Sequence, residues 1–358
     1  MLPTRKSLES AAKRAAAKAI GALPEQATAV LAGSPYEIDG NVLDTQLQLA
    51  MKGASFDGSI AEMSLEGARR SSAAGFAIGN APRVPGVTAT ETLIADPVHG
   101  ELHARVYTPA NGSTDTDSAR PGVLFLHQGG LVIGGLDTCD TFCSQLSAGL
   151  GAVVVSLDYL LAPEHPVPTQ NGNVDAAWAW LNDSAKHLGV DPQQLVVCGD
   201  SAGGQLAASL CQRLRDTGQP GPVVQVLVYP FVDASSQGGS MDSCAAAWPL
   251  TIEISRYFMA QLQADGLDPL DPSFSPALHP TLSDLPPAVV VTAGFDILRD
   301  QGRDYAHRLA LAGVPVIERC ETTLCHSFLS FGGLSTAAFD ASERIVSDVA
   351  TLLAEAFE

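Results

Sequence analysis

The stretch Leu195-Val-Val-Cys-Gly-Asp-Ser-Ala-Gly-Gly-Gln205 decides the fold that we predict for this chain of 358 residues. A short apolar run ends, glycines stand two residues before and two residues after Ser201, and a helix-forming run follows. This is the G-x-S-x-G pattern, in which a serine sits on a strained strand-to-helix turn too tight for side chains at the flanking positions. Alone the pattern is weak, because a chain with 33 glycines can contain it by chance. A serine that caps a helix is the alternative.

The overall composition indicates a globular protein with a large core. Hydrophobic residues make up 46% and charged residues 16%, which suits one large α/β domain or a domain with a lid. The formal net charge of −19 argues against nucleic acid and anionic membrane surfaces as partners, since both would repel the chain. No run approaches the ~20 apolar residues of a membrane span, and no signal peptide is evident. We therefore expect a cytoplasmic protein.

Seven cysteines are scattered along the chain, with no C-x-x-C pair and no Cys/His quartet at zinc spacing. Cys139 and Cys143 stand four residues apart and could share a helix face, but such pairs are usually packing residues. We therefore expect reduced thiols and no metal site.

Short apolar runs and helical patterns alternate from about residue 100 onward. The runs are short and rich in valine, which is typical of strands buried on both faces. This alternation predicts an α/β fold, a mostly parallel central sheet flanked by helices. The expected strands are 103–107, 123–126, 152–157, 195–198, 223–229, 288–292 and 314–317, and the expected helices are 41–51, 141–150, 174–188, 204–215, 252–264, 302–311 and 339–357.

Two segments fall outside this alternation. Residues 1–85 are rich in Ala, Gly and Ser, with an amphipathic helix or a transit peptide over residues 11–23. Residues 231–287 contain one helical pattern, no strand and many turn residues, and an insertion of that length is usually functional. We expect residues 1–85 and about 232–280 to form a helical cap on a catalytic domain of residues 86–358.

Reactive residue types follow the predicted strands, at the edge where the carboxyl ends of parallel strands meet. A serine needs a base within hydrogen-bond reach, and His326 is the histidine at a strand end that follows Ser201 with an acid between them. Asp296 follows its strand directly, whereas Asp300 falls at the start of a helix, where a capping role is more natural. We therefore favour Asp296 as the acid that orients His326.

Acyl transfer also needs hydrogen-bond donors for the negative oxygen of the transition state. The amide of Ala202, directly after the serine, supplies one. Gly129 and Gly130 follow strand 123–126 at the same edge, and glycine lets the backbone come close, so their amides are expected to supply the others. His127 precedes the serine and suits a loop-holding role.

These blocks resemble the hormone-sensitive-lipase-like branch of the α/β-hydrolases, a group of bacterial carboxylesterases with an H-G-G-G loop. The resemblance covers about residues 100–330 and implies the α/β-hydrolase fold, with Ser201 as nucleophile, Asp296 as acid and His326 as base. The matching blocks are His127-Gln-Gly-Gly-Leu-Val-Ile-Gly134, Asp158-Tyr-Leu-Leu-Ala-Pro-Glu-His-Pro166, Gly199-Asp-Ser-Ala-Gly-Gly204, Phe295-Asp-Ile-Leu-Arg-Asp300 and Cys325-His-Ser-Phe328.

The resemblance further implies that Asp158 and Glu164 support the loop of His127 and Gln128 without joining the chemistry; ordinary turn and salt-bridge roles are the alternative. Two positions depart from the family pattern. Gln128 replaces the first glycine of H-G-G-G, so the loop's shape or the substrate range is expected to change. Leu160 replaces an arginine, which removes a charged tether.

The sequence thus predicts a serine carboxylesterase that needs no metal or organic cofactor and acts on small-molecule esters of short to medium acyl chain length. The family resemblance implies the chain-length range and a homodimer through 314–317 and 339–357. The residues expected to line the acyl pocket are Leu131, Asp200, Trp248, Phe258 and Leu262.

Three alternatives remain open. An amidase, lactonase or acyltransferase would use the same three residues. A non-enzymatic ligand-binding protein is the second, because the plant gibberellin receptors resemble this family but have lost the catalytic histidine. A thiol enzyme based on Cys325 beside His326 is the third.

Overall fold

An eight-stranded sheet organises the computed structural model of this chain, which describes residues 19–54, 58–110, 119–263 and 267–357. The strand order is β10-β9-β8-β7-β5-β6-β4-β3, and every neighbouring pair is parallel except those that involve β4. This confirms the predicted fold class. The strands are β3 (Val87–Asp96), β4 (Gly100–Pro109), β5 (Arg120–Leu126), β6 (Val153–Asp158), β7 (Val190–Asp200), β8 (Val224–Val228), β9 (Ala288–Phe295) and β10 (Val316–Cys325).

The central strands are buried on both faces, which explains their runs of valine. Val123 of β5 lies between Val154 of β6 and Val196 of β7, and all three side chains are at most 1% exposed. Helices on both faces exclude water from these strands, so their side chains need not alternate in polarity. Because β5, β7, β8 and β9 are parallel, the carboxyl ends of β5, β7 and β9 lie at one edge.

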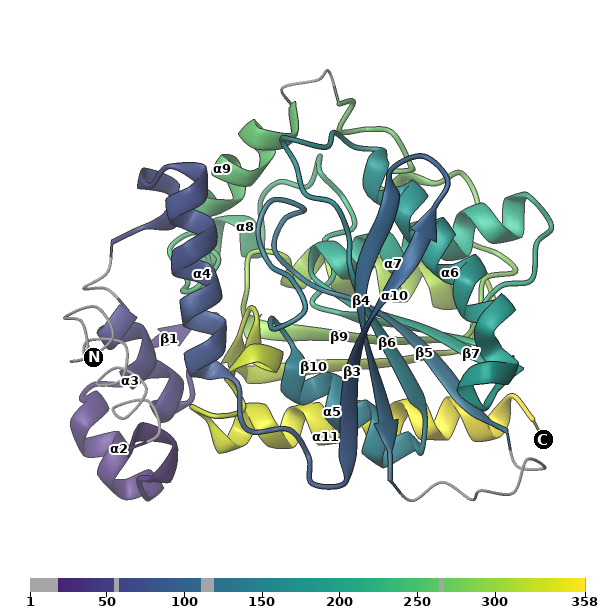
Figure 1. The fold of residues 1–358 in the computed structure, drawn as a ribbon. Coiled ribbons are helices and arrows are strands. Elements are labelled where there is room, and N and C mark those ends of the chain that lie inside the picture. Colours follow the sequence, from purple (N-terminus) through teal and green to yellow (C-terminus); the bar gives the residue numbers. More distant parts are fainter. Residues whose placement is uncertain (1–18, 55–57, 111–118, 264–266, 358) are drawn as a thin grey trace, which may run out of the picture.

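Long helices cover the two faces of the sheet (Figure 1). Two of them, α5 (Asp140–Leu150) and α11 (Thr336–Glu355), pack together on one face. The opposite face carries α6 (Thr169–Leu188), α7 (Ala202–Asp216) and α10 (Arg299–Leu311).

A group of shorter elements lies at one end of the sheet, where α4, which ends at Gly79, and α9, which begins at Ile252, stand near each other although they are far apart in the chain (Figure 1). They come from the two segments that fall outside the strand–helix alternation. The N-terminal elements are α2 (Glu25–Ala32), β1 (Glu37–Ile38), β2 (Asn41–Val42), α3 (Thr45–Ala54), η1 (Ile60–Glu62) and α4 (Leu65–Gly79), and those of the insertion are α8 (Ser240–Ser243), α9 (Ile252–Leu262) and η3 (Pro276–Leu278).

Several boundaries differ from the sequence prediction. No strand was expected at β3, an edge strand in which only Ile94 and Asp96 are buried and which therefore lacks a core-like apolar run. β10 begins later than expected and continues to Cys325, and the insertion contains the short helices α8 and η3 in addition to α9. Most of the helix expected over 11–23 lies outside the described residues. Among the described helices, none combines the length and the apolar character that crossing a membrane requires.

Candidate active site

The turn from β7 to α7 places Ser201 in a strained backbone conformation, with φ 55° and ψ −117°. The flanking glycines are required by close packing. A Cβ atom at Gly203 would lie 1.9 Å from the carbonyl oxygen of Leu126, and one at Gly199 would lie 2.1 Å from that of Gly203. The tight turn holds the serine at the start of α7, where the helix dipole favours negative charge.

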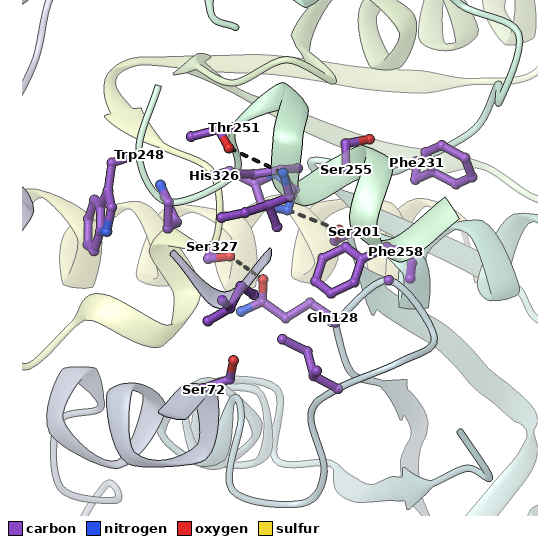
Figure 2. A pocket seen from close by; sticks show the side chains of 18 of the residues that line it. Ser72, Gln128, Ser201, Phe231, Trp248, Thr251, Ser255, Phe258, His326 and Ser327 are labelled. Atoms are coloured by element: carbon purple, nitrogen blue, oxygen red, sulfur yellow. Dashed lines mark hydrogen bonds between the residues drawn. The ribbon is translucent and has the colours of Figure 1, made fainter. Parts of the chain in front are cut away.

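A hydrogen-bonded chain joins Ser201, His326 and Asp296, which come from three different strand ends. His326 Nδ1 lies 2.7 Å from Asp296 Oδ2, and its Nε2 lies 3.0 Å from Ser201 Oγ (Figure 2). Because a carboxylate only accepts, Nδ1 carries the proton and Nε2 is free to accept from the serine hydroxyl. The amide of Leu298 donates to the other Asp296 oxygen at 2.8 Å and fixes the carboxylate.

The structure separates the two candidate acids. Asp300 lies in the first turn of α10, where its carboxylate accepts from the Ser240 amide at 2.8 Å and from Arg299 Nε at 3.0 Å. Its contacts therefore hold α8 and α10 together. Asp296 is the acid that reaches His326, as the sequence favoured.

The glycine loop after β5 begins with a buried imidazole. His127 Nδ1 donates to the carbonyl of Gln128 at 2.7 Å, and the ring stacks on Tyr159 with centroids 4.2 Å apart. Asp158 Oδ1 lies 3.9 Å from His127 Nε2. Burial lowers the pKa of His127 and raises that of Asp158, so burial disfavours charge on both side chains. These contacts support the loop-holding role expected of His127.

Arg69 on α4 makes a charged contact with the turn that contains Leu160. Its guanidinium forms two hydrogen bonds of 2.7 Å with Glu164 and donates to the carbonyls of Val132 and Ala162 at 2.9 Å. The Arg69 hydrogen bond lowers the pKa of Glu164. Sequence reasoning missed this contact, because no periodicity or motif relates a helix at residue 69 to a turn 95 positions away.

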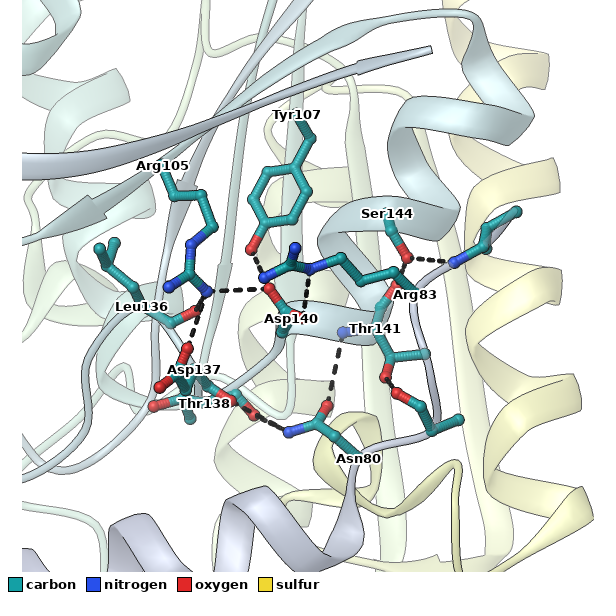
Figure 3. Close-up of polar contacts among 12 residues, drawn as sticks. Asn80, Arg83, Arg105, Tyr107, Leu136, Asp137, Thr138, Asp140, Thr141 and Ser144 are labelled. Carbon is teal, nitrogen blue, oxygen red and sulfur yellow. Dashed lines mark hydrogen bonds and ion pairs between the residues drawn. The ribbon is translucent and has the colours of Figure 1, made fainter. Parts of the chain in front are cut away.

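A second polar network anchors the end of the glycine loop (Figure 3). Asp140, at the start of α5, accepts from Arg83 Nε at 2.6 Å, Arg105 at 2.9 Å and the Tyr107 hydroxyl at 2.7 Å. Arg105 also donates to Asp137 at 2.8 Å. The network ties β4 and the chain after α4 to α5 through residues that belong to no motif in the sequence.

Ser201 lines a cavity of about 560 Å³ (Figure 2). Its wall combines residues of the N-terminal elements, the glycine loop and the insertion. Four of the five residues predicted to line a pocket are present in this wall. They are Leu131, Trp248, Phe258 and Leu262, and Gly129, Gly130 and Ala202 also border the cavity.

The fifth predicted pocket residue, Asp200, is fully buried and does not line the cavity, so this prediction was wrong. Successive side chains of a strand point to opposite faces, so the residue before Ser201 turns away from it. Its carboxylate accepts from the Tyr229 hydroxyl at 2.9 Å and from the Cys139 thiol at 3.4 Å. Burial raises the pKa of Asp200 to about 6.

The cysteines and acidic residues offer no second centre in the part of the chain that the structure describes. All seven cysteines are free thiols. Burial raises the pKa of Cys325 well above its ordinary value, which opposes the thiolate that a thiol enzyme needs. No cluster of three or more His, Cys, Asp or Glu side chains suited to a metal occurs among the described residues.

Comparison with known proteins agrees with this geometry. Residues 123–330 match the family described as alpha/beta hydrolase fold. The chain is 36% identical to the carboxylic ester hydrolase LipN of Mycobacterium tuberculosis over 91% of this chain and 87% of that protein. It is also 36% identical to an ethyl acetate hydrolase of Pseudomonas putida over 68% of this chain and 77% of that protein.

Among solved structures, the alpha/beta hydrolase enzyme LAE6 from the metagenome of Lake Arreo, Spain, is similar with a TM-score of 0.79 at 31% identity, over 85% of this chain and 96% of LAE6. The family match spans more than half of the chain. The match to LipN, which is named a carboxylic ester hydrolase, covers most of both chains. The chain therefore belongs to the α/β-hydrolases, in the hormone-sensitive-lipase-like branch of carboxylesterases.

Proposed function

We propose that this carboxylic ester hydrolase acts through Ser201 as nucleophile, His326 as general base and Asp296 as the acid that orients the histidine. The observation that carries the proposal is the unbroken chain of hydrogen bonds of 3.0 Å and 2.7 Å from the serine hydroxyl to the buried carboxylate. The carboxylate fixes the tautomer of His326 and stabilises the imidazolium that forms when it takes the serine proton.

The reaction then runs in two halves. Ser201 Oγ attacks the ester carbonyl while His326 Nε2 accepts its proton, and the same proton passes to the leaving alcohol as the acyl-enzyme forms. A water molecule, deprotonated by His326, attacks the acyl-enzyme, and His326 returns this proton to Ser201 Oγ as the carboxylic acid is released. Both halves use only side chains that border the cavity or lie directly behind it, so no metal or organic cofactor is required.

The oxyanion would be held by the amides of Gly129, Gly130 and Ala202. All three residues border the cavity together with Ser201. Ala202 is the first residue of α7, where the helix dipole favours negative charge. Removing one oxyanion donor from enzymes of this kind costs about 2.7–4 kcal/mol in the transition state.

We further propose that residues up to 85 and residues 232–280 act together as a cap that sizes the acyl pocket. The cavity wall includes Phe76 near the end of α4, and Trp248 and Phe258 from the insertion. Apart from His326, the described lining residues carry no ionisable side chain, which favours an uncharged acyl chain. We propose short to medium acyl chains as substrates, which the cavity of about 560 Å³ and a relative named ethyl acetate hydrolase support.

The test is a comparison of wild type with Ser201→Ala. The variant should lose hydrolysis of p-nitrophenyl esters and covalent labelling by diethyl p-nitrophenyl phosphate, with an unchanged circular dichroism spectrum. A variant that still turns over esters would remove Ser201 from the mechanism. Esters of rising chain length locate the length limit, and matched anilides and lactones separate an esterase from an amidase or a lactonase.

We also propose the homodimer that the family resemblance implies. It is supported by the position of β10 at the edge of the eight-stranded sheet, where β9 is its one neighbouring strand in that sheet within the described part of the chain; the Asp44 amide covers the end of its outer side by donating to the Thr323 carbonyl at 2.8 Å. Light scattering of the purified protein would show a mass of twice 37.1 kDa if the edge pairs with a second copy.

A further inference from the structure

We propose that Gln128 is a positioning residue, which locks the loop that carries His326 to the loop that carries Gly129 and Gly130. The inference rests on the proposed function, because it assigns a role in aligning the base with the oxyanion donors. This role also explains why glutamine, and not the glycine of the family pattern, stands between these two closely packed loops.

The side chain amide of Gln128 is 2% exposed and joins two residues that follow the histidine. The Ser327 hydroxyl donates to Gln128 Oε1 (Figure 2), and Gln128 Nε2 donates to Ser330 Oγ at 2.8 Å. Ser330 in turn donates its own proton to the carbonyl of Thr138 at 2.7 Å. Each hydroxyl has one proton to donate, so the direction of every bond in this chain is determined.

The first consequence concerns His326. Ser327, the next residue, has φ 65° and ψ 16°, a left-handed conformation that residues with a Cβ atom rarely adopt. The hydrogen bond to Gln128 holds this conformation, and with it the path of the chain as it leaves His326. Without it, the imidazole would have room to turn away from Ser201.

The second consequence concerns the donors of the oxyanion hole. Gln128 directly precedes Gly129, and its own carbonyl accepts from His127 Nδ1 at 2.7 Å. The backbone carbonyl of Gln128 is thus hydrogen-bonded to His127 at the end of β5, and its side chain is hydrogen-bonded to the segment after β10. A glycine at this position could make only the backbone bond.

Gln128 also lines the cavity, so a change in volume has to be separated from the loss of the hydrogen bonds. Methionine has a similar length and volume but cannot make either bond. Gln128→Met therefore keeps the filled space and leaves Ser327 and Ser330 without their partner.

Steady-state hydrolysis of p-nitrophenyl acetate tests the proposal below the unfolding temperature of every variant. Gln128→Met should lower kcat about tenfold and change KM less than about twofold, since the alignment of reacting groups is lost and the pocket is not. Labelling by diethyl p-nitrophenyl phosphate should slow by the same factor. A matched control is Gln145→Met, because this buried glutamine also donates to one side chain, Glu343 at 2.7 Å, but lies on α5 outside the cavity. Its kcat should equal that of wild type.

A double-mutant cycle with Ser327→Ala identifies the coupling. If the bond acts as proposed, the double variant is no slower than the slower single variant; multiplying effects would overturn the proposal. An unchanged kcat in Gln128→Met, or a loss explained by a smaller folded fraction, would overturn it as well. If wild type neither hydrolyses the ester nor reacts with the phosphate, the proposed function fails; an active wild type with a normal Gln128→Met variant overturns this inference alone.

Discussion

Asp200 should make the stability of this protein depend on pH in a way that one substitution removes. The carboxyl group is fully buried next to the nucleophile, and one of its oxygens has no hydrogen-bond partner in the described structure. Burial raises its pKa to about 6 from an ordinary value of 3.8. Asp200→Asn keeps the size of the side chain and the oxygen that accepts from Tyr229, but it cannot ionise.

The magnitude follows from the pKa difference. Between the two pKa values the folded chain holds a proton that the unfolded chain has released, so stability falls as pH rises through this window. Each pKa unit is worth about 1.4 kcal/mol, which gives about 3 kcal/mol in total, fully developed above pH 6. About half of this, ~1.4 kcal/mol, is lost between pH 5 and pH 8.

Urea unfolding at pH 5, 6, 7 and 8 measures this effect, with the free energy of unfolding taken from linear extrapolation. The difference between Asp200→Asn and wild type should rise by ~1.4 kcal/mol from pH 5 to pH 8, whatever constant offset the substitution introduces. Titrating groups that do not interact with Asp200 are common to both proteins and cancel. Two stability curves that stay parallel over this range would refute the raised pKa of Asp200.

Two further predictions concern residues around the same site. Asp296→Asn should lower kcat by orders of magnitude, whereas Asp300→Asn should leave it within about threefold, because Asp296 contacts His326 and Asp300 contacts the Ser240 amide. Steady-state ester hydrolysis measures both variants, and the reverse order of effects would make Asp300 the acid. Arg69→Met should lower the free energy of unfolding by about 1–3 kcal/mol, since Val132, Ala162 and Glu164 lose their shared donor. Urea unfolding measures this loss, with Arg70→Met as the control. Equal effects of the two variants would contradict a special role for Arg69.

The parts of the fold that local sequence determines could be predicted well. The valine-rich runs of the central strands are long enough to be recognised from composition and period alone. Once those strands are parallel, Ser201, Asp296 and His326 are expected at one edge of the sheet. The edge strand β3 was missed for the corresponding reason. Its exposed side chains resemble those of a loop, and its place is set by pairing with β4.

The contacts that hold the loops depended on tertiary structure and could not be read from the chain. Gln128 was recognised as a departure from the family pattern, but its partners, Ser327 and Ser330, lie about 200 positions further along. Asp200 was placed in the pocket because it neighbours Ser201 in sequence. The alternation of side chains along β7, visible only once the strand is known to continue to Asp200, points it to the other side.

The two departures from the family pattern have one physical feature in common. Leu160 removes a guanidinium from the turn beside the glycine loop, and Arg69 supplies one from α4, so that the tether now depends on the N-terminal segment being in place. Gln128 adds a link between the glycine loop and the segment after His326. Both restraints exist only in the folded chain, and the one from Arg69 should make the turn that contains Leu160 sensitive to the packing of α4.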